Sequence, residues 1–138
     1  WARTPADRCR HNIAYWTSQD WWGIGPGAHS YGGPSEGRPA TRWWNVKHPR
    51  AYADRLAEGE LPIQEREQLG DEELALENVM LRLRLSEGLA VAEVGRPDAV
   101  AGLIASGVLE GREALAGTLK LTRRGRLLAD RAVRELTT

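Results

Sequence analysis

The chain contains very little cysteine: Cys9 is the only one among its 138 residues. A single thiol cannot form an internal disulfide, and it cannot supply the several thiolates that hold an iron–sulfur cluster. The sequence therefore predicts a protein of a reducing compartment that does not assemble a thiolate cluster from its own residues.

The chain also lacks long apolar runs and an excess of charge of either sign. No stretch approaches the roughly 18 apolar residues of a membrane span, and no signal sequence opens the chain. Nineteen Lys and Arg balance nineteen Asp and Glu, so the overall field attracts neither nucleic acid nor an anionic membrane. We expect a cytoplasmic protein without an integral membrane segment, which recognises its partners through a local site.

An initiator methionine is absent as well, because the chain opens with WARTPADRC. This opening predicts an internal piece of a longer protein, without its N-terminal part. The composition, with 41% hydrophobic and 28% charged residues, suits one compact domain or a small domain with an appendage.

Aromatic side chains are concentrated in the first third of the chain. Residues 1–48 hold all six Trp, all three His and two of the three Tyr, whereas residues 71–138 hold none of these and are rich in Leu, Ala, Arg and Glu. This shift predicts two units joined by residues 49–70. In that connection Pro49 opens a short helix, Gly59 ends it, and a linker follows.

The first unit consists of short aromatic segments separated by glycine and proline. AYW at 14–16, DWW at 20–22 and RWWNV at 42–46 predict strands. The glycine- and proline-rich run at 22–39 predicts a loop.

Helical periods dominate the second unit. Residues 74–85 predict a central, buried helix, and residues 97–107 predict a second helix. Residues 108–110 and 118–121 predict two strands that form a wing, and Thr122 caps a last helix. The inward positions of that last helix are Ala129, Ala132, Val133 and Leu136. This order of elements is winged-helix-like.

His11 lies beside Tyr15 and Trp16 in the segment CRHNIAYW. An imidazole whose second nitrogen is held by a neighbour can ligate a metal, and aromatic rings offer a flat wall for a porphyrin. Heme is the ligand that this combination suits. Seen as residues alone, however, a single histidine among aromatics is more often a packed or hydrogen-bonded side chain, so both interpretations stay open.

Other candidate ligands are weaker. Cys9 can supply an axial thiolate, yet a lone cysteine is usually a small buried hydrophobe, so it ranks below His11. His48, before Pro49, is expected to be a solvated loop residue.

A glycine-rich loop follows the histidine segment. Glycine at three alternate positions allows backbone amides to approach a ligand closely, although a tight surface turn is the simpler explanation. The candidate ligand-binding residues of this loop are Gly23, Gly25, Gly27, Ala28, His29 and Ser30.

CRHNIAYW followed by WWGIGPGAHS resembles the paired signature of the HemW branch of radical-SAM proteins, the heme-chaperone relatives of oxygen-independent coproporphyrinogen III oxidases. The segments RWWNVKHPRAYADRLAEGELP, ELALENVMLRLRLSEGL and LKLTRRGRLLADRAVREL resemble the rest of that family's last third. The resemblance implies an α+β fold. It implies the C-terminal edge of a partial radical-SAM (β/α) barrel at 1–48, a connecting helix and linker at 49–70, and a HemN-type winged-helix-like domain at 71–138.

The resemblance also implies roles for the motif residues. It makes His11 the candidate ligand of heme iron, with Asn12, Tyr15 and Trp16 as its setting, for delivery of heme to heme-accepting proteins. It places the glycine-rich loop where the related oxidase binds S-adenosyl-L-methionine (SAM). The family's CxxxCxxC, which holds a 4Fe–4S cluster, is absent from this chain. We therefore expect this chain by itself neither to build the cluster nor to cleave SAM.

Two further functions stay open. A coproporphyrinogen oxidase shares the barrel, the cluster and SAM, so the fold does not separate it from a chaperone, and only HNxxYW with GAHS favours the chaperone. A winged-helix order also suggests DNA binding, which seven Lys or Arg against three Asp or Glu in the last 27 residues slightly support. Residues 98–109, however, contain no Arg, Lys, Asn or Gln to read a groove, so we expect no nucleic-acid partner.

Overall fold

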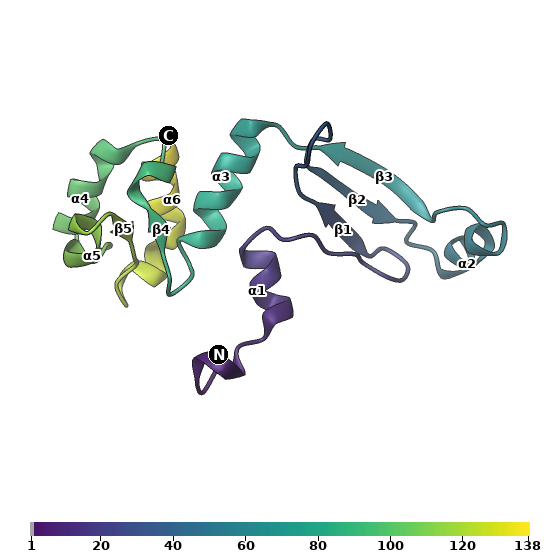
Figure 1. The fold of residues 1–138 in the computed structure, drawn as a ribbon, viewed down its shortest axis with the longest axis horizontal. Coiled ribbons are helices and arrows are strands. Elements are labelled where there is room, and N and C mark those ends of the chain that lie inside the picture. The colour runs from purple at the N-terminus through teal and green to yellow at the C-terminus, as the bar shows by residue number, and fades with distance from the viewer. Residues whose placement is uncertain (1) are drawn as a thin grey trace. The chain divides into compact units, whose positions relative to one another are not determined.

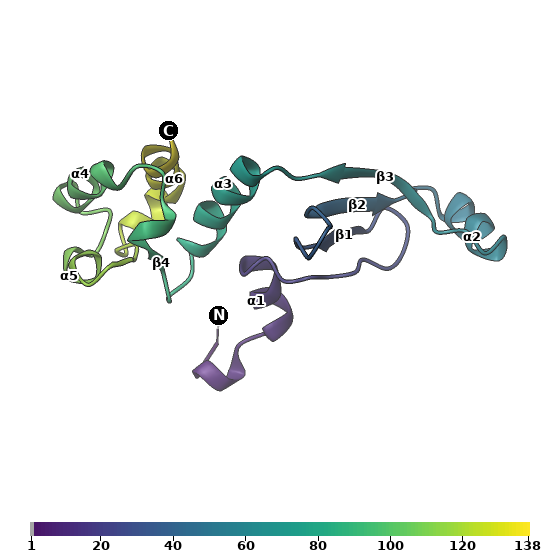
Figure 2. The ribbon, with the colours of Figure 1, turned by 45° about the horizontal axis from the view of Figure 1, so that its top comes forward.

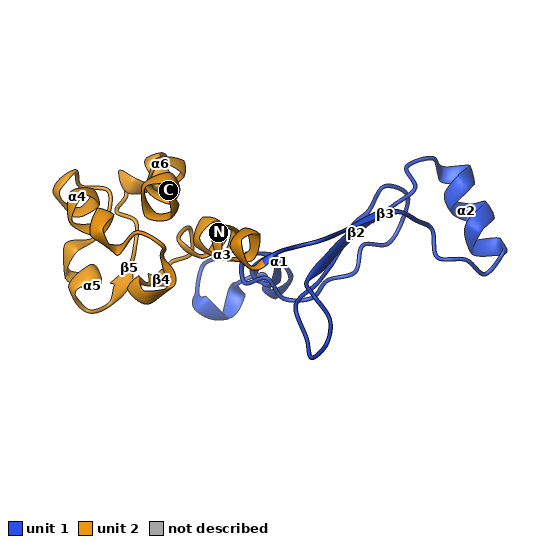
Figure 3. Ribbon diagram, turned by 90° about the horizontal axis from the view of Figure 1, so that it is seen from above, with its two compact units in different colours: residues 1–70 blue, residues 71–138 orange. Residues whose placement is uncertain are grey.

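The computed structural model describes residues 2–138, and Trp1 lies outside the described residues. Two compact units make up the chain, one ending at Gly70 and the other beginning at Asp71 (Figure 3). Helices and strands occur in both units, which confirms the mixed α and β composition expected from the sequence (Figure 1).

The first unit is built on a three-stranded antiparallel sheet with the order β1-β2-β3 (Figure 2). Its strands are β1 (His29–Gly32), β2 (Thr41–Asn45) and β3 (Ile63–Gln68). His29 lies opposite Trp44, and Ser30 lies opposite Trp43. Because side chains alternate between faces along a strand, Trp43 and Trp44 project from opposite faces of the sheet.

Three helical segments accompany the sheet in this unit. They are η1 (Pro5–Asp7), α1 (Arg10–Trp16) and α2 (Pro49–Ala57). The short helix predicted after residue 48 is confirmed, since Pro49 is its first residue and Gly59, with φ of 77°, ends it in the left-handed conformation that favours glycine. The strand predicted at 42–46 is confirmed as β2.

Other predictions for the first unit are wrong. Residues 14–16 belong to helix α1, and residues 20–22 form only an isolated bridge between Trp21 and Tyr31. The predicted loop contains β1, and the predicted linker contains β3. These segments are strands because their backbone groups pair with β2, a tertiary interaction that local composition does not reveal.

The second unit is helical, with two very short strands. Its elements are α3 (Asp71–Arg82), β4 (Leu89–Ala90), η2 (Val91–Glu93), η3 (Pro97–Ala99), α4 (Val100–Ala105), α5 (Gly111–Leu115), β5 (Thr118–Leu119), η4 (Gly125–Leu128) and α6 (Ala129–Thr137). The helix predicted at 97–107 is confirmed as η3 and α4, and Gly107 follows with φ of 70°.

The apolar core of the described chain lies almost entirely in this second unit. Its members are Val79, Leu83, Leu89, Val94, Leu103, Val108, Leu109, Leu119, Leu121, Ala129, Ala132, Val133 and Leu136. The predicted inward stripe of the last helix is thereby confirmed. The prediction that Thr122 caps the last helix is wrong, because α6 begins at Ala129 and Leu128 precedes it. The hydroxyl of Thr122 instead accepts a hydrogen bond at 2.8 Å from the amide of Gly125, the first residue of η4.

Two other predictions for the second unit need correction. Helix α3 is not centrally buried, because Val79 is its one buried residue while Leu76 and Met80 are 47% and 39% exposed. Leu83, which follows the helix, is fully buried. The wing is also different, because β5 pairs with β4 and residues 108–110 supply only the bridge of Leu109 to Leu121. Helix α5 lies between the two predicted strands. Within residues 2–138, no helix has both the length and the apolar character that crossing a membrane requires.

Arg96 connects the middle of this unit to its end. The guanidinium of Arg96 donates to both carboxylate oxygens of Asp98, at 3.0 and 2.8 Å, and to the carbonyl of Thr138 at 2.9 Å. The hydrogen bond from Arg96 lowers the pKa of the Asp98 carboxyl below its usual range.

Candidate functional site

The histidine segment forms helix α1, which presents a polar aromatic pair to solvent. His11 and Tyr15 are one turn apart on the same face, and the Tyr15 hydroxyl lies 3.0 Å from Nε2 of His11. Their ring centroids are 4.9 Å apart with an edge-on angle of 79°. His11 is exposed, and Tyr15 and Trp16 are 39% and 37% exposed. Asn12 is also exposed. The four predicted heme-site residues therefore lie on one accessible helix.

An aromatic row connects this helix to the sheet. The Tyr15 ring meets Trp21 edge-on at 4.9 Å, and Trp21 stacks on Tyr31 of β1 at 6.5 Å. Trp21 and Tyr31 also exchange backbone hydrogen bonds of 3.0 and 2.9 Å. Sequence reasoning gave Trp21 no role in the site, since its contact with Tyr15 exists only after the chain has folded back onto β1.

The remaining candidate ligands lie apart from this pair. Cys9 is exposed as the residue before α1, so the expectation of a buried hydrophobe is wrong. His48 is exposed immediately before α2, as expected. His29 stacks on Trp44 at 5.6 Å and so belongs to a different ring cluster from His11. No group of three or more His, Cys, Asp or Glu suited to a metal ion occurs within residues 2–138.

The amides of the glycine-rich loop donate to groups of the protein itself. Gly23 N–H donates to the Ser30 hydroxyl at 3.0 Å, and Gly25 N–H donates to the Tyr52 hydroxyl at 3.2 Å. Gly27 N–H donates to the carbonyl of Val46 at 2.9 Å. The loop is therefore closed by its own hydrogen bonds.

Each glycine of this loop also has a local structural reason. A Cβ on Gly23 would stand 1.9 Å from the carbonyl oxygen of His29, so only glycine permits this close backbone approach. Gly25 and Gly27 have φ of 109° and 68°, which favour glycine. These requirements exist without any ligand, and the role of Gly23, Gly25, Gly27, Ala28, His29 and Ser30 in binding a cofactor stays a prediction.

Asn45 is a structural residue of this region that sequence reasoning missed. Its side-chain amide donates to the carbonyls of Gly23 at 3.3 Å and Gly25 at 3.0 Å, and the residue is 5% exposed. The register of β2 and β3 shifts between Trp44 and Asn45. No sequence signal could have singled out Asn45, because it lies 20 or more residues from its partners.

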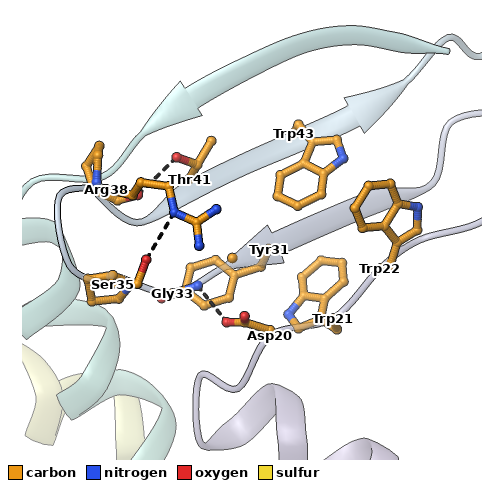
Figure 4. A pocket seen from close by; sticks show the side chains of 12 residues that line it. Asp20, Trp21, Trp22, Tyr31, Gly33, Ser35, Arg38, Thr41 and Trp43 are labelled. Atoms are coloured by element: carbon orange, nitrogen blue, oxygen red, sulfur yellow. Dashed lines mark hydrogen bonds between the residues drawn. The ribbon is translucent and has the colours of Figure 1, made fainter. Parts of the chain in front are cut away.

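A hollow of about 480 Å³ lies beside the aromatic row, at the end of β1 (Figure 4). Trp21, Trp22, Tyr31 and Trp43 supply its aromatic lining. The lining also includes the side chains of Asp20, Ser35, Arg38 and Thr41, which Figure 4 labels. This hollow was not predicted from the sequence, because its walls come from residues 20–43, which were predicted as separate strands and a loop.

Comparison with known proteins adds the remaining evidence. No protein-family model matches the chain. The heme chaperone HemW of Mycobacterium tuberculosis is 46% identical over 138 residues, which are 99% of this chain and 33% of that protein. The chain is a HemW homologue. The HemW of Bacillus subtilis is 29% identical over 131 residues, covering 88% of this chain and 32% of its own length.

The HemW resemblance inferred from the two motifs is thereby confirmed, over about a third of the length of the relatives that the chain matches. The chain is also similar in structure to HemN of Escherichia coli, described as a coproporphyrinogen III oxidase and radical SAM enzyme, with a TM-score of 0.61. That match covers 87% of this chain and 29% of HemN at 19% sequence identity. At this identity the match establishes a shared fold and leaves activity undetermined.

Proposed function

We propose that this HemW-like chain is a heme-binding segment of a radical-SAM heme chaperone that delivers heme to heme-accepting proteins. The observation that carries the proposal is the exposed His11–Tyr15 pair on α1, within a chain 46% identical to a heme chaperone. Its residue types fit heme, because imidazole and phenol oxygen both serve as iron ligands in proteins and the rings supply apolar contact.

The geometry suggests how His11 serves as the ligand. Its Nε2 is held by the Tyr15 hydroxyl, so Nδ1 is the ring nitrogen that can bind without loss of this hydrogen bond. A ligating histidine commonly has its second nitrogen held by a neighbour, which fixes the orientation of the ring. In this proposal Tyr15 positions His11, while Asn12 and Trp16 form the surrounding helix surface.

The test is a heme titration followed by the Soret band, with wild type, His11→Ala and a control, His48→Ala. We expect His11→Ala to weaken binding about tenfold or more and to shift the Soret maximum, because an iron ligand is lost. His48→Ala removes an exposed histidine outside α1, so we expect it to leave the heme affinity and the Soret maximum unchanged. Equal affinity and identical spectra for wild type and His11→Ala would contradict the proposal.

The chain spans about a third of the length of the relatives it matches, and the finer architecture and the other cofactors are proposed for a protein of their full length. There we propose that residues 1–48 complete the C-terminal edge of a radical-SAM barrel, that residues 71–138 form a winged-helix-like domain, and that residues outside this chain hold the 4Fe–4S cluster. The loop from Gly23 to Ser30 would face SAM through exposed side chains such as Ile24 and His29, since its glycine amides are already engaged. The motif resemblance supports these assignments. We also propose a cytoplasmic location, which the single cysteine supports.

A further inference from the structure

The hollow at the end of β1 has features of a small-molecule site that the motif residues do not explain. Its volume of about 480 Å³ falls in the range of roughly 300–1,000 Å³ that such sites occupy. It lies entirely within the first unit, and its lining is aromatic with a few polar groups. That combination is typical of small-molecule binding sites.

Two indole rings form a corner of this hollow. Trp22 and Trp43 meet edge-on with ring centroids 5.2 Å apart and an interplanar angle of 75°. Trp22 is 63% exposed, which leaves a large apolar face in water. Because tryptophan rings gain stability by stacking and burial, this corner favours a flat aromatic partner.

Arg38 supplies the cationic group of the hollow. A tight turn holds it, since Ser35 and Arg38 exchange backbone hydrogen bonds of 3.1 and 2.9 Å and Gly37 between them has φ of 72°. Nε of Arg38 donates to the Ser35 hydroxyl at 3.2 Å, and the two terminal nitrogens point toward the middle of the hollow (Figure 4). Terminal guanidinium nitrogens present paired donors that match a carboxylate.

Asp20 is the acidic residue of the lining. Its Oδ1 accepts the amide of Gly33 at 2.7 Å, so this oxygen is used in holding the turn after β1. The hollow thus has one fixed acid and one cation, and the cation is the group suited to an anionic ligand. Trp21 connects the hollow to α1, because it lines the hollow and its ring centroid lies 4.9 Å from that of Tyr15.

We propose that this hollow binds the ring of a planar tetrapyrrole that bears carboxylates, with Trp22 and Trp43 against the ring and Arg38 paired with a carboxylate. This assignment rests on the proposed heme-binding function and adds a second position for the tetrapyrrole, separate from α1. No residue of α1 lines the hollow, so a ring seated there would not have its central iron bound to His11. Two observations favour this occupant. Arg38 can pair with a carboxylate, and the exposed corner of Trp22 and Trp43 can stack on a planar ring.

Iron-free protoporphyrin IX separates this subsite from iron ligation. Its binding to the full 138-residue chain is followed by quenching of tryptophan fluorescence and by its own absorbance. We expect Arg38→Gln to weaken binding about tenfold, because a hydrogen-bonded charge pair is lost, and Trp22→Ala to weaken it about threefold to tenfold through lost stacking. A water-soluble porphyrin with only cationic substituents should bind Arg38→Gln at least as well as wild type.

Matched controls lie outside the hollow. Arg50→Gln removes an exposed arginine of α2, and Trp44→Ala removes an indole that projects from the other face of the sheet, so both should keep wild-type affinity for protoporphyrin IX. Circular dichroism of each variant establishes that it is folded.

The outcomes separate the two proposals. If His11→Ala weakens heme binding while Arg38→Gln and Trp22→Ala bind protoporphyrin IX like wild type, the subsite is overturned and the heme function stands. If protoporphyrin IX binding depends on Arg38 while His11→Ala leaves heme binding unchanged, the subsite stands and the ligand assignment falls. If wild type does not bind protoporphyrin IX, the subsite is overturned.

Discussion

The hydroxyl of Tyr15 holds the ring of His11 from one helical turn away, at 3.0 Å from Nε2. Tyr15 makes a second contact through its ring, which meets Trp21 at 4.9 Å. The two contacts use different parts of the side chain. A phenylalanine at this position would retain the ring contact and lose only the hydrogen bond.

Tyr15→Phe should therefore weaken heme binding by about twofold to tenfold, the value of one neutral hydrogen bond, because His11 loses the partner that orients it. The measurement is a heme titration at equal protein concentration. Tyr52→Phe is the matched control, since Tyr52 lies on α2 and its hydroxyl serves Gly25 instead. A Tyr15→Phe affinity equal to wild type would show that the hydrogen bond does not position the ligand.

Asn45 links β2 to the glycine-rich loop, and its replacement should destabilise the first unit. Asn45→Ala removes two donated hydrogen bonds and leaves the carbonyls of Gly23 and Gly25 without this donor, which costs about 1–3 kcal/mol. Urea unfolding followed by tryptophan fluorescence reports on this unit, because every tryptophan lies within residues 1–48. Asn12→Ala, at an exposed position of α1, should change stability by less than about 0.5 kcal/mol. Equal unfolding midpoints for both variants would contradict this role for Asn45.

The helices and strands of the two units differ in how much apolar surface they bury. Of the described apolar side chains, Tyr31, Ala40, Val46 and Leu69 are the buried ones of the first unit, against thirteen in the second. The sheet of the first unit depends on backbone pairing among β1, β2 and β3, whereas α3, α4 and α6 pack side chains into a continuous core. Burial of apolar surface is the dominant favourable contribution to folding.

Residues 71–138 should consequently fold alone, with helical circular dichroism and a cooperative thermal transition. We expect residues 1–70 expressed alone to unfold at a lower temperature than residues 71–138. Leu136→Ala, which truncates a side chain with no exposed surface on α6, should lower the stability of the 71–138 piece by about 2–5 kcal/mol. A coil-like spectrum for residues 71–138 would show that its core requires the rest of the protein.

The charge of the whole chain is balanced, and its distribution disfavours DNA as a partner. Residues 65–93 carry eight Asp or Glu against three Arg, a net charge of minus five. Among the basic residues near the C-terminus, Lys120 pairs with Glu113 at 3.0 Å and Arg131 pairs with Glu135 at 2.7 Å. Helix α4, within the segment expected to enter a groove, is VAGLIA and has no polar side chain.

We therefore expect no retardation of duplex DNA by the full chain at micromolar concentration and moderate salt. A winged-helix protein that neutralises phosphates would instead bind duplex weakly even without its specific site. Its log affinity would fall with log salt at about 0.9 per phosphate contacted. Sequence-selective binding with such a salt slope would replace the chaperone proposal by that of a regulator.

The sequence by itself determined the features that depend on neighbouring residues. Pro49 and Gly59 delimit α2 because proline suits a first helical turn and glycine suits the left-handed residue that follows one. The stripe from Ala129 to Leu136 predicted the buried face of α6, since the helical period alone brings these residues together. The motifs that identified the HemW relationship are likewise short and contiguous.

Tertiary structure decided what depends on residues far apart in the chain. The segment IQEREQ has no apolar alternation and becomes β3 only because β2 supplies its backbone partners. Segment 14–16 became helical instead of extended, and that helix places His11 and Tyr15 one turn apart. The hollow with Arg38, Trp22 and Trp43 exists only after the turn at Gly37 brings residues on either side of it together. Local propensity cannot encode such contacts, because their free energy appears only when the partner strand is in place.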